Sequence, residues 1–212
     1  MESDKFIRED AAKLRGFFAT KFNEYLLLHQ HLKNNKFLYK YPYIQYKMIE
    51  NIPLILGIRE GVNVIEEIYD KYHRINLNGH IYEILEKGIS LKEEDFILSD
   101  KLLNYSFLTP WLALNEKNYE RYQELKTIQE KKDLLKKILV GNIISMSKGF
   151  GYTVPEPIRA NIIRFKEVST SLKGNPMLGF LGSFEVNFEI PDYLGLGKSV
   201  SRGFGTIKRI SQ

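Results

Sequence analysis

The sequence predicts an α+β protein with antiparallel sheets, and three observations lead to this class. Short segments in which apolar and polar residues alternate are separated by tight-turn signals, as in β-hairpins. Other segments repeat apolar residues every three or four positions, as amphipathic helices do. Strand-rich stretches also follow one another without a helix between them, which is typical of antiparallel sheets. With 212 residues and a change of pattern near Asp100, we expect two small domains, residues 1–100 and 101–212.

The first half is expected to contain a helix, two strands, a second helix and a hairpin. Residues 8–28 repeat apolar side chains at helical spacing. The stretch IQYKMIENIPLILGI indicates two strands joined by a turn at Glu50 and Asn51. EGVNVIEEIYDKY has helical spacing and an acidic start, which suits a helix N-terminus. RINLNGHIYEI carries Asn-Gly between alternating apolar residues, which is a strong hairpin signal.

The second half is expected to contain a strand, one long helix and three further strands. LLNYSFLTPWLAL is extended as far as Pro110, and residues 115–149 form a single helix with Asn115 as its cap. The segments ANIIRFKEVST, MLGFLGSFEVNFEIP and FGTIKRI are rich in β-branched and aromatic residues and are separated by Gly and Pro. This half therefore predicts an antiparallel sheet with one long helix.

Composition narrows the classes of function. The formal net charge is +5, and basic residues without acidic ones gather between Tyr193 and Gln212, which favours a polyanionic partner. A chain without cysteine has no disulfide, thiolate metal site or cysteine nucleophile. The amino terminus lacks the apolar run of a signal peptide, and no stretch approaches the length of about 18 apolar residues that a membrane span needs. We expect a soluble, cytoplasmic protein.

The segment GLGKSVSRGFG near the carboxyl end is a candidate anion site. Glycines let successive backbone N–H groups converge on an oxygen anion, and neighbouring cations add charge. The spacing differs from that of a Walker A loop, so phosphates of a nucleic-acid backbone fit better than ATP. The alternative is a glycine-rich bulge or hairpin with solvated basic side chains. The candidate RNA-binding residues here are Gly195, Gly197, Lys198, Arg202, Gly203 and Gly205.

A second candidate group, with acid–base chemistry, lies in LLLHQHLKNNKFLYKYPYIQYK. Histidine exchanges a proton near neutral pH, and tyrosine is a weaker acid that also stacks on bases. Since residues two apart in a helix point to nearly opposite sides, His29 and His31 share a site only where the helix has ended, near Leu28. A zinc site, packed histidines and ordinary strand tyrosines are the alternatives. Lys40 and Lys47 stand among the tyrosines as candidate RNA contacts.

These segments together resemble a known family. LRGFFATKF, LLLHQH, YKYPYIQYK and PLILGIREG in the first half, and FLTPWLALNEKNY, LLKKILVGNIISMSKG, MLGFLGSFEVNFEIP and GLGKSVSRGFG in the second, are similar to the CRISPR-associated endoribonuclease that processes precursor CRISPR RNA. The similarity is to the branch with paired histidines in its first domain, within the repeat-associated RNA-binding superfamily. It covers residues 14–210 in the same order.

The resemblance implies two tandem ferredoxin-like (RRM-like) domains and cleavage of CRISPR repeat RNA to mature crRNA. The implied reaction is metal-independent, uses no cofactor and proceeds by attack of the 2′-hydroxyl on the scissile phosphate. The implied catalytic residues are His29, His31 and Tyr39, with Tyr41 as the alternative tyrosine, and it is open which histidine is the base. The glycine-rich loop is implied to hold RNA. The expected partners are precursor CRISPR RNA, subunits of a CRISPR effector complex and a second copy of the chain.

The amino terminus departs from the family pattern. A ferredoxin-like domain begins with a strand, and MESDKFIRED has poor strand propensity. The first domain is therefore expected to lack its opening strand, or the sequence to begin after it, and the sheet edge so exposed would pair with a second copy. Two rival functions stay open. They are a non-catalytic RNA-binding subunit of an effector complex and a structural domain whose long helix binds a protein.

Overall fold

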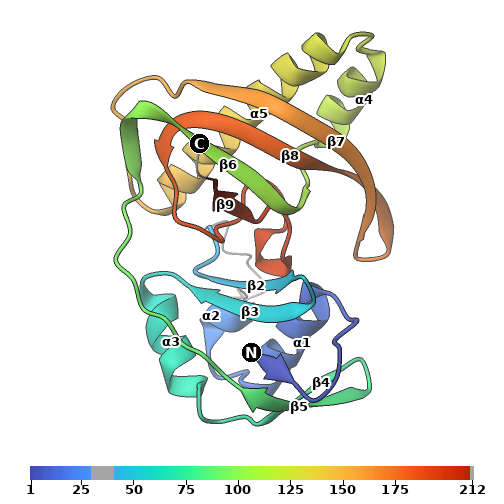
Figure 1. Ribbon diagram of the computed structural model, residues 1–212, viewed down its shortest axis with the longest axis vertical. Helices are drawn as coiled ribbons and strands as arrows, with labels where there is room; N and C mark the ends of the chain where they lie inside the picture. The colour runs from blue at the N-terminus through green and yellow to red at the C-terminus, as the bar shows by residue number, and fades with distance from the viewer. Residues whose placement is uncertain (30–40, 211–212) are drawn as a thin grey trace. The chain divides into compact units, whose positions relative to one another are not determined.

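The computed structural model describes residues 1–29 and 41–210, with the side chain of His29 outside that description. The chain forms two compact units, shown in Figure 1. Unit 1 consists of Met1–Glu93 together with Val200–Gly203, and unit 2 consists of Glu94–Ser199 and the chain from Phe204 onward. A four-residue segment of the glycine-rich loop thus belongs to unit 1, although it lies far from the rest of that unit in the sequence.

The described part of unit 1 contains two antiparallel sheets and the helices between their strands. One sheet has the strand order β1-β5-β4, and β2 pairs with β3 in the other. In chain order the elements are β1 (Glu2–Ser3), α1 (Ala11–Lys21), α2 (Leu26–His29), β2 (Ile44–Ile49), β3 (Ile52–Gly57), α3 (Glu60–Ile68), β4 (Arg74–Leu77), β5 (His80–Glu86) and the short 3-10 helix η1 (Val200–Arg202).

The two hairpins of unit 1 follow from their turn residues, as predicted. Glu50 and Asn51 have φ angles of 50° and 65°, and Ile49 pairs with Ile52 across the turn. Asn78 and Gly79 have φ angles of 55° and 91° and join β4 to β5. Two consecutive left-handed residues give a turn whose twist matches that of the strands, which explains why Asn-Gly marks the second hairpin.

The core of unit 1 is centred on aromatic side chains. Phe18 of α1 is fully buried, and its ring centroid lies 5.8 Å from that of Tyr46 and 5.0 Å from that of Tyr72. Leu14 lies one helical turn earlier on the same face and is equally buried. These contacts place α1 against β2, which is the strand that carries the candidate basic residue Lys47.

Two expectations for the amino-terminal region need correction. The helix expected over residues 8–28 is two helices, because α1 ends at Lys21 and the chain turns before α2 begins at Leu26. The opening strand is present, although it is only two residues long: Ser3 pairs with Ile84 of β5. The segment MESDKFIRED has poor strand propensity, so β1 forms because it pairs with β5.

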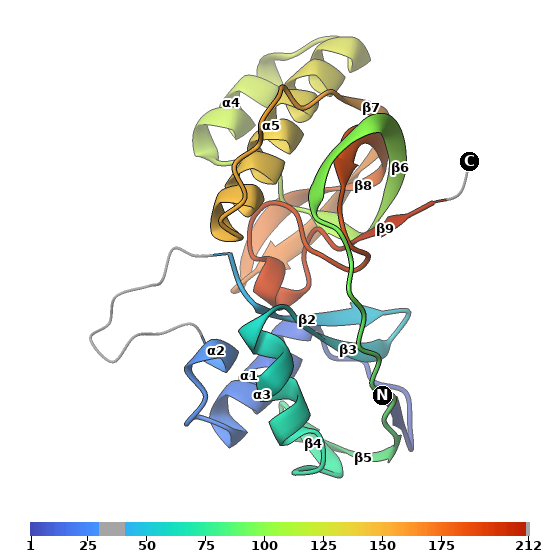
Figure 2. The same cartoon turned by 90° about the vertical axis from the view of Figure 1, so that its left-hand side faces the viewer.

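Unit 2 contains one antiparallel sheet with the strand order β7-β8-β6-β9. Figures 1 and 2 show α5 lying along one face of this sheet. Leu135, Leu139 and Ile143 recur on one side of α5 and are completely buried. The elements are β6 (Ile97–Trp111), α4 (Glu116–Glu124), α5 (Ile128–Gly149), β7 (Ala160–Leu172), β8 (Asn175–Glu189) and β9 (Ile207–Arg209).

The single helix expected over residues 115–149 is wrong, because the chain forms α4 and α5 with a break between them. Leu125 is extended, with ψ of 132°, and Thr127 begins α5 with a capping box. Its hydroxyl accepts a hydrogen bond from the Glu130 N–H, and the Glu130 carboxylate accepts one from the Thr127 N–H. The Thr-x-x-Glu pattern is a helix-start signal inside an apparently continuous helical stripe. Asn115 caps α4 as expected.

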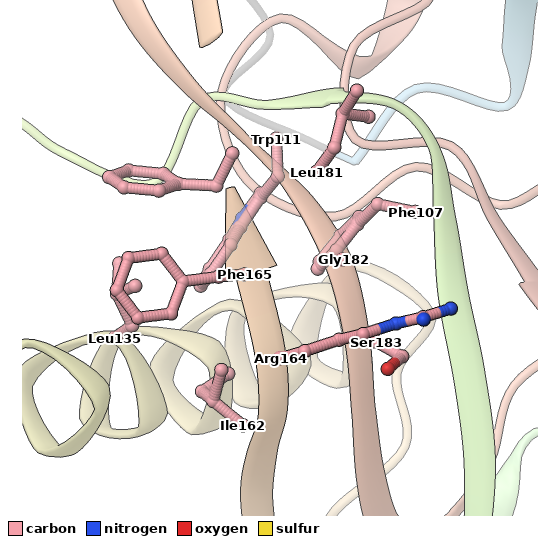
Figure 3. Close-up of a pocket in the computed structure, with 10 residues that line it drawn as sticks. Phe107, Trp111, Leu135, Ile162, Arg164, Phe165, Leu181, Gly182 and Ser183 are labelled. Carbon is pink, nitrogen blue, oxygen red and sulfur yellow. The ribbon is translucent and has the colours of Figure 1, made fainter. Parts of the chain in front are cut away.

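A small cavity lies in the core of unit 2 (Figure 3). Its volume is about 10 Å³, and its lining includes Phe107, Trp111 and Phe165. A space of that size holds one water molecule at most, so it is a packing gap rather than a substrate site.

In the part of the chain that the structure describes, no helix is long and apolar enough to cross a membrane.

Candidate nucleic-acid interface

The residues expected to carry catalysis lie at the edge of the described structure. His29 is the last described residue of α2. The preceding Leu28 is 1% exposed and anchors this end of α2 in the core of unit 1. The side chain of His29 lies outside the described residues, as do His31, Tyr39 and Lys40. Tyr41, the alternative tyrosine, is half-buried just before β2.

The glycines of the carboxyl-terminal loop are required by the packing of the protein itself. Gly197, Gly203 and Gly205 have φ angles of 88°, 88° and 62°, which only glycine adopts readily. A Cβ atom on Gly197 would lie 2.6 Å from Nε1 of Trp111, and one on Gly205 would overlap the carbonyl oxygen of Leu196. These glycines therefore allow close approach of protein atoms, whatever else the loop binds.

Several backbone N–H groups of the loop already have protein acceptors. The Leu196 N–H donates to the carbonyl of Gly205 over 2.9 Å, and the Gly205 N–H donates to Pro110 over 2.9 Å. The N–H of Lys198 donates to the carbonyl of Leu112 over 3.2 Å. Gly195 forms an isolated bridge with Thr206. The expected cradle of N–H groups around an anion is thus largely satisfied internally, and the side chains must supply most of the attraction for a phosphate.

Two cationic side chains of the loop are accessible to a ligand. Lys198 is exposed, and Arg202 in η1 is half-buried. Gly203, the residue after Arg202, packs closely against unit 1. A Cβ at this position would lie 2.6 Å from Cβ of Ala11 and 3.1 Å from the carbonyl oxygen of Tyr46. Within unit 1, the glycine thus lets η1 lie directly on α1 and β2. Gly203 thus allows the close packing of η1, and Arg202 provides a positive charge.

The position of Lys47 corrects the expectation of an exposed RNA contact. Its side chain is 0% exposed, and its ammonium donates to Gln45 Oε1 over 2.8 Å and to the carbonyl of Val200 over 3.4 Å. Burial lowers the pKa of Lys47 from 10.5 to about 7, because the charged form is poorly solvated inside the protein. Both acceptors are neutral groups. Lys47 therefore holds the η1 segment through its hydrogen bond to Val200 and does not reach the surface.

Two residues near this segment have no counterpart in the sequence-based expectations. Arg15 lies one turn after Ala11 on α1, and both burial and the positive charge of Arg202 lower its pKa. The two guanidinium groups are therefore near neighbours in unit 1. Burial also raises the pKa of Tyr46, whose hydroxyl has no hydrogen-bond partner among the described residues. We call Arg15 and Arg202 the basic cluster; like charges brought together in this way favour an anion.

The sequence reveals only one of the two arginines of the basic cluster. Arg202 stands out in the sequence because it lies among glycines. Arg15 lies in an ordinary amphipathic helix and has no local mark of function, so only the approach of η1 reveals its role. Tyr46 has the alternation of a strand residue, and its unsatisfied hydroxyl is visible only in the folded protein.

Comparison with known proteins assigns the chain to a family. A model of the Cas6b N-terminal domain matches residues 1–95, and a model of the Cas6b C-terminal domain matches residues 97–210. The chain belongs to the Cas6b family. A crystal structure of Cas6b superposes with a TM-score of 0.90 at 41% identity and covers 97% of this chain and 94% of that one. The family resemblance and the two-domain ferredoxin-like fold predicted from the sequence are thereby confirmed.

Other proteins are also similar to this chain. A crystal structure of the CRISPR RNA processing endoribonuclease Cas6b has a TM-score of 0.74 at 39% identity and covers 94% of this chain and 90% of that one. The uncharacterized protein MJ0978 of Methanocaldococcus jannaschii is 44% identical over 146 residues, which is 69% of this chain and 99% of that protein. A Cas6-related protein from Pyrococcus furiosus shares the fold, with a TM-score of 0.59 at 15% identity over 100% of this chain and 95% of that one.

Proposed function

We propose that this Cas6b family member is an endoribonuclease that cuts precursor CRISPR RNA within the repeat, without a metal ion. The observation that carries the proposal is the match to both Cas6b domains, since a relative 39% identical in sequence is a CRISPR RNA processing endoribonuclease. The proposed catalytic residues are His29, His31 and Tyr39, which the chain holds in the order that its resemblance to this family implies.

The proposed reaction is an internal displacement at phosphorus. A base removes the proton of the ribose 2′-hydroxyl, and the resulting oxygen attacks the adjacent phosphorus. The bond from phosphorus to the 5′-oxygen breaks, and an acid protonates that oxygen as it leaves. One fragment ends in a 2′,3′-cyclic phosphate and the other begins with a 5′-hydroxyl. Two histidines and a tyrosine supply the proton donors and acceptors that these steps need.

The basic cluster and Lys198 are the proposed contacts for the RNA backbone. Arg202 and Arg15 present planar guanidinium groups, which suit phosphate oxygens, and Lys198 adds an exposed ammonium. Lys47 and the loop glycines support these contacts by fixing η1. Association with effector subunits or with a second copy remains a prediction.

The test of this function is cleavage of repeat RNA from the CRISPR locus that accompanies the gene, with EDTA present. We expect cutting of the ribose RNA and no cutting of the same RNA carrying one 2′-deoxyribose at the scissile position. His29→Ala and His31→Ala should each reduce the cleavage rate by at least about 100-fold, in the range that general acid–base groups contribute. The matched control is His73→Ala, which removes an exposed histidine far from α2 in the sequence.

The outcomes separate the rival functions. Binding of both RNAs without cleavage of either would replace the enzyme by a non-catalytic RNA-binding subunit. Absence of salt-dependent RNA binding would favour a protein-interaction domain, because phosphate contacts weaken as salt rises. Cleavage of the 2′-deoxy RNA would exclude the internal displacement, and a requirement for a divalent ion would exclude the metal-independent reaction.

A further inference from the structure

A groove lies between α4 and α5 of unit 2, which run side by side in Figures 1 and 2. Its volume is about 380 Å³, within the range of sites that hold one small ligand. Residues of α4 and of the segment before it form one wall, and α5 forms the other. The floor is apolar, with Leu134 and Ile138 of α5 on the same helix face.

The amide side chains in the groove are oriented by hydrogen bonds at their oxygen atoms. Asn142 Oδ1 accepts from Nε1 of Trp111 over 3.0 Å, and this leaves its NH₂ group as the part available to a ligand. Asn115 Oδ1 accepts from the N–H of Asn118 over 2.8 Å as the cap of α4, so it too offers its NH₂ group. The groove therefore presents donors, and its ligand must be rich in acceptors.

The charges in the groove point to the same kind of ligand. Arg121 of α4 and Lys137 of α5 are exposed and line opposite walls. Neither forms an ion pair within residues 1–29 and 41–210, and no carboxylate lines the groove there. A guanidinium and an ammonium that line the same groove attract an anion, such as a phosphate.

Gly141 keeps the groove open. It lies in the middle of α5, where glycine is less favourable than alanine. A Cβ at this position would meet no protein atom within 4 Å, so the packing of the protein does not require glycine there. Any side chain at position 141 would instead extend into the groove that Gly141 lines. The missing side chain is consistent with space reserved for a ligand.

We propose that the α4–α5 groove binds one unpaired nucleotide of the RNA. Its phosphate contacts Arg121 and Lys137, its base lies on the apolar floor, and a carbonyl oxygen of the base accepts from the Asn142 amide. This subsite rests on the proposed function, because it assumes that the ligand is RNA. The carbonyl oxygens of uracil, cytosine and guanine all suit this donor.

The first experiment measures the affinity for repeat RNA that carries 2′-deoxyribose at the scissile position, so that binding is observed without cleavage. Gly141→Glu places a carboxylate in the groove and should weaken binding at least 10-fold, whereas Gly141→Gln, with the same shape but no charge, should weaken it less. Equal affinity of the glutamate variant and the wild type would overturn the proposal.

A second experiment asks whether the groove contacts a phosphate. Arg121→Gln combined with Lys137→Gln should reduce the dependence of log affinity on log salt by about 0.7 for each phosphate that the protein no longer neutralises. Lys136→Gln, which removes an exposed lysine outside the groove lining, is the matched control and should change it less. Equal slopes for the double variant and the control would overturn the phosphate interaction.

A third readout locates the base directly. Repeat RNA with 4-thiouridine at single positions should crosslink to peptides containing residues 115–142 at one of these positions, and Gly141→Glu should abolish that crosslink. Crosslinks elsewhere only would overturn the subsite. Cleavage of ribose RNA is measured separately. If the wild type cleaves this RNA and the groove variants bind RNA as tightly as the wild type, the groove subsite is refuted and the proposed function stands. If the wild type does not bind repeat RNA at all, the proposed function is refuted.

Discussion

The glycine-rich loop and helix α5 use glycine for opposite reasons. In the loop, Gly205 has a left-handed φ of 62° and leaves no room for a side chain beside Leu196. In α5, a side chain at Gly141 would enter open space. The sequence singles out the glycines of the loop, yet packing explains three of them, Gly197, Gly203 and Gly205. Among the described residues, no protein contact requires glycine at Gly141 of α5, and the same holds for Gly16 of α1.

This contrast shows that a glycine-rich motif is by itself weak support for a ligand site. A left-handed φ and a close protein contact are sufficient reasons for glycine. A glycine that meets neither condition and lines a groove calls for another reason. Charged residues differ in the same way, because Lys47 beside the loop is buried while Lys137 beside Gly141 is exposed.

The largest effect that tests this contrast is expected from Gly205→Ala. We expect a loss of about 3 kcal/mol or more in the free energy of unfolding, because left-handed strain adds to overlap with a backbone carbonyl. Gly174→Ala is the matched control, since Gly174 has φ of 83° but open space around its Cβ position, and it should lose about 1 kcal/mol. Urea unfolding measures both. Equal losses would mean that overlap adds nothing to the strain.

The next effect concerns the buried cation that supports the loop. The pKa of Lys47 is about 7 in the folded protein and 10.5 ordinarily, so between these values the unfolded chain binds more protons and stability rises with pH. Relative to Lys47→Met, the wild type should gain about 1–3 kcal/mol between pH 7 and pH 9 and nothing between pH 5 and pH 6. Unfolding curves at these four pH values test this. Parallel pH profiles would show that Lys47 is not desolvated.

The counterpart in α5 is a modest gain of stability. Gly141→Ala should raise the free energy of unfolding by about 0.5–1 kcal/mol, because alanine has the higher helix propensity and its methyl group meets no protein atom. Thermal and urea unfolding measure this difference. A loss similar to that of Gly205→Ala would remove the contrast between the two regions.

The smallest change in stability is expected from Tyr46→Phe. The hydroxyl is buried without a hydrogen-bond partner among the described residues, so its removal should alter stability by less than about 1 kcal/mol and in the favourable direction. Affinity for non-cleavable repeat RNA should not change, because the hydroxyl is buried. A clear loss of stability would show that the hydroxyl does have a hydrogen-bond partner.

Most of the fold could be predicted from local sequence. The turn at Asn78 and Gly79, the cap at Asn115 and the three carboxyl-terminal strands each depend on residues close together in the chain. The break between α4 and α5 was missed, although Thr127 and Glu130 mark it, because the apolar stripe continues across it. The strand Glu2–Ser3 could not be predicted, since it is ordered by pairing with β5 rather than by its own propensity.

The candidate site was predictable in part. The sequence singled out His29, His31, Lys198 and Arg202, and the first two await the cleavage test because their side chains lie outside the described residues. Arg15 could not be found, because its proximity to Arg202 arises only when η1 packs on α1. The groove between α4 and α5 was also invisible, since a single continuous helix would not contain it.

The sequence by itself determined the family, the class of fold and the residue types that suit RNA cleavage, because these depend on local patterns and their order. Only the tertiary structure decided which of the basic residues are accessible. Strand alternation placed Lys47 on the polar face of β2, yet Val200–Gly203 covers that face and buries its ammonium. A segment more than 150 positions away in the chain made that difference, and burial of a charge depends on what covers it rather than on its neighbours in sequence.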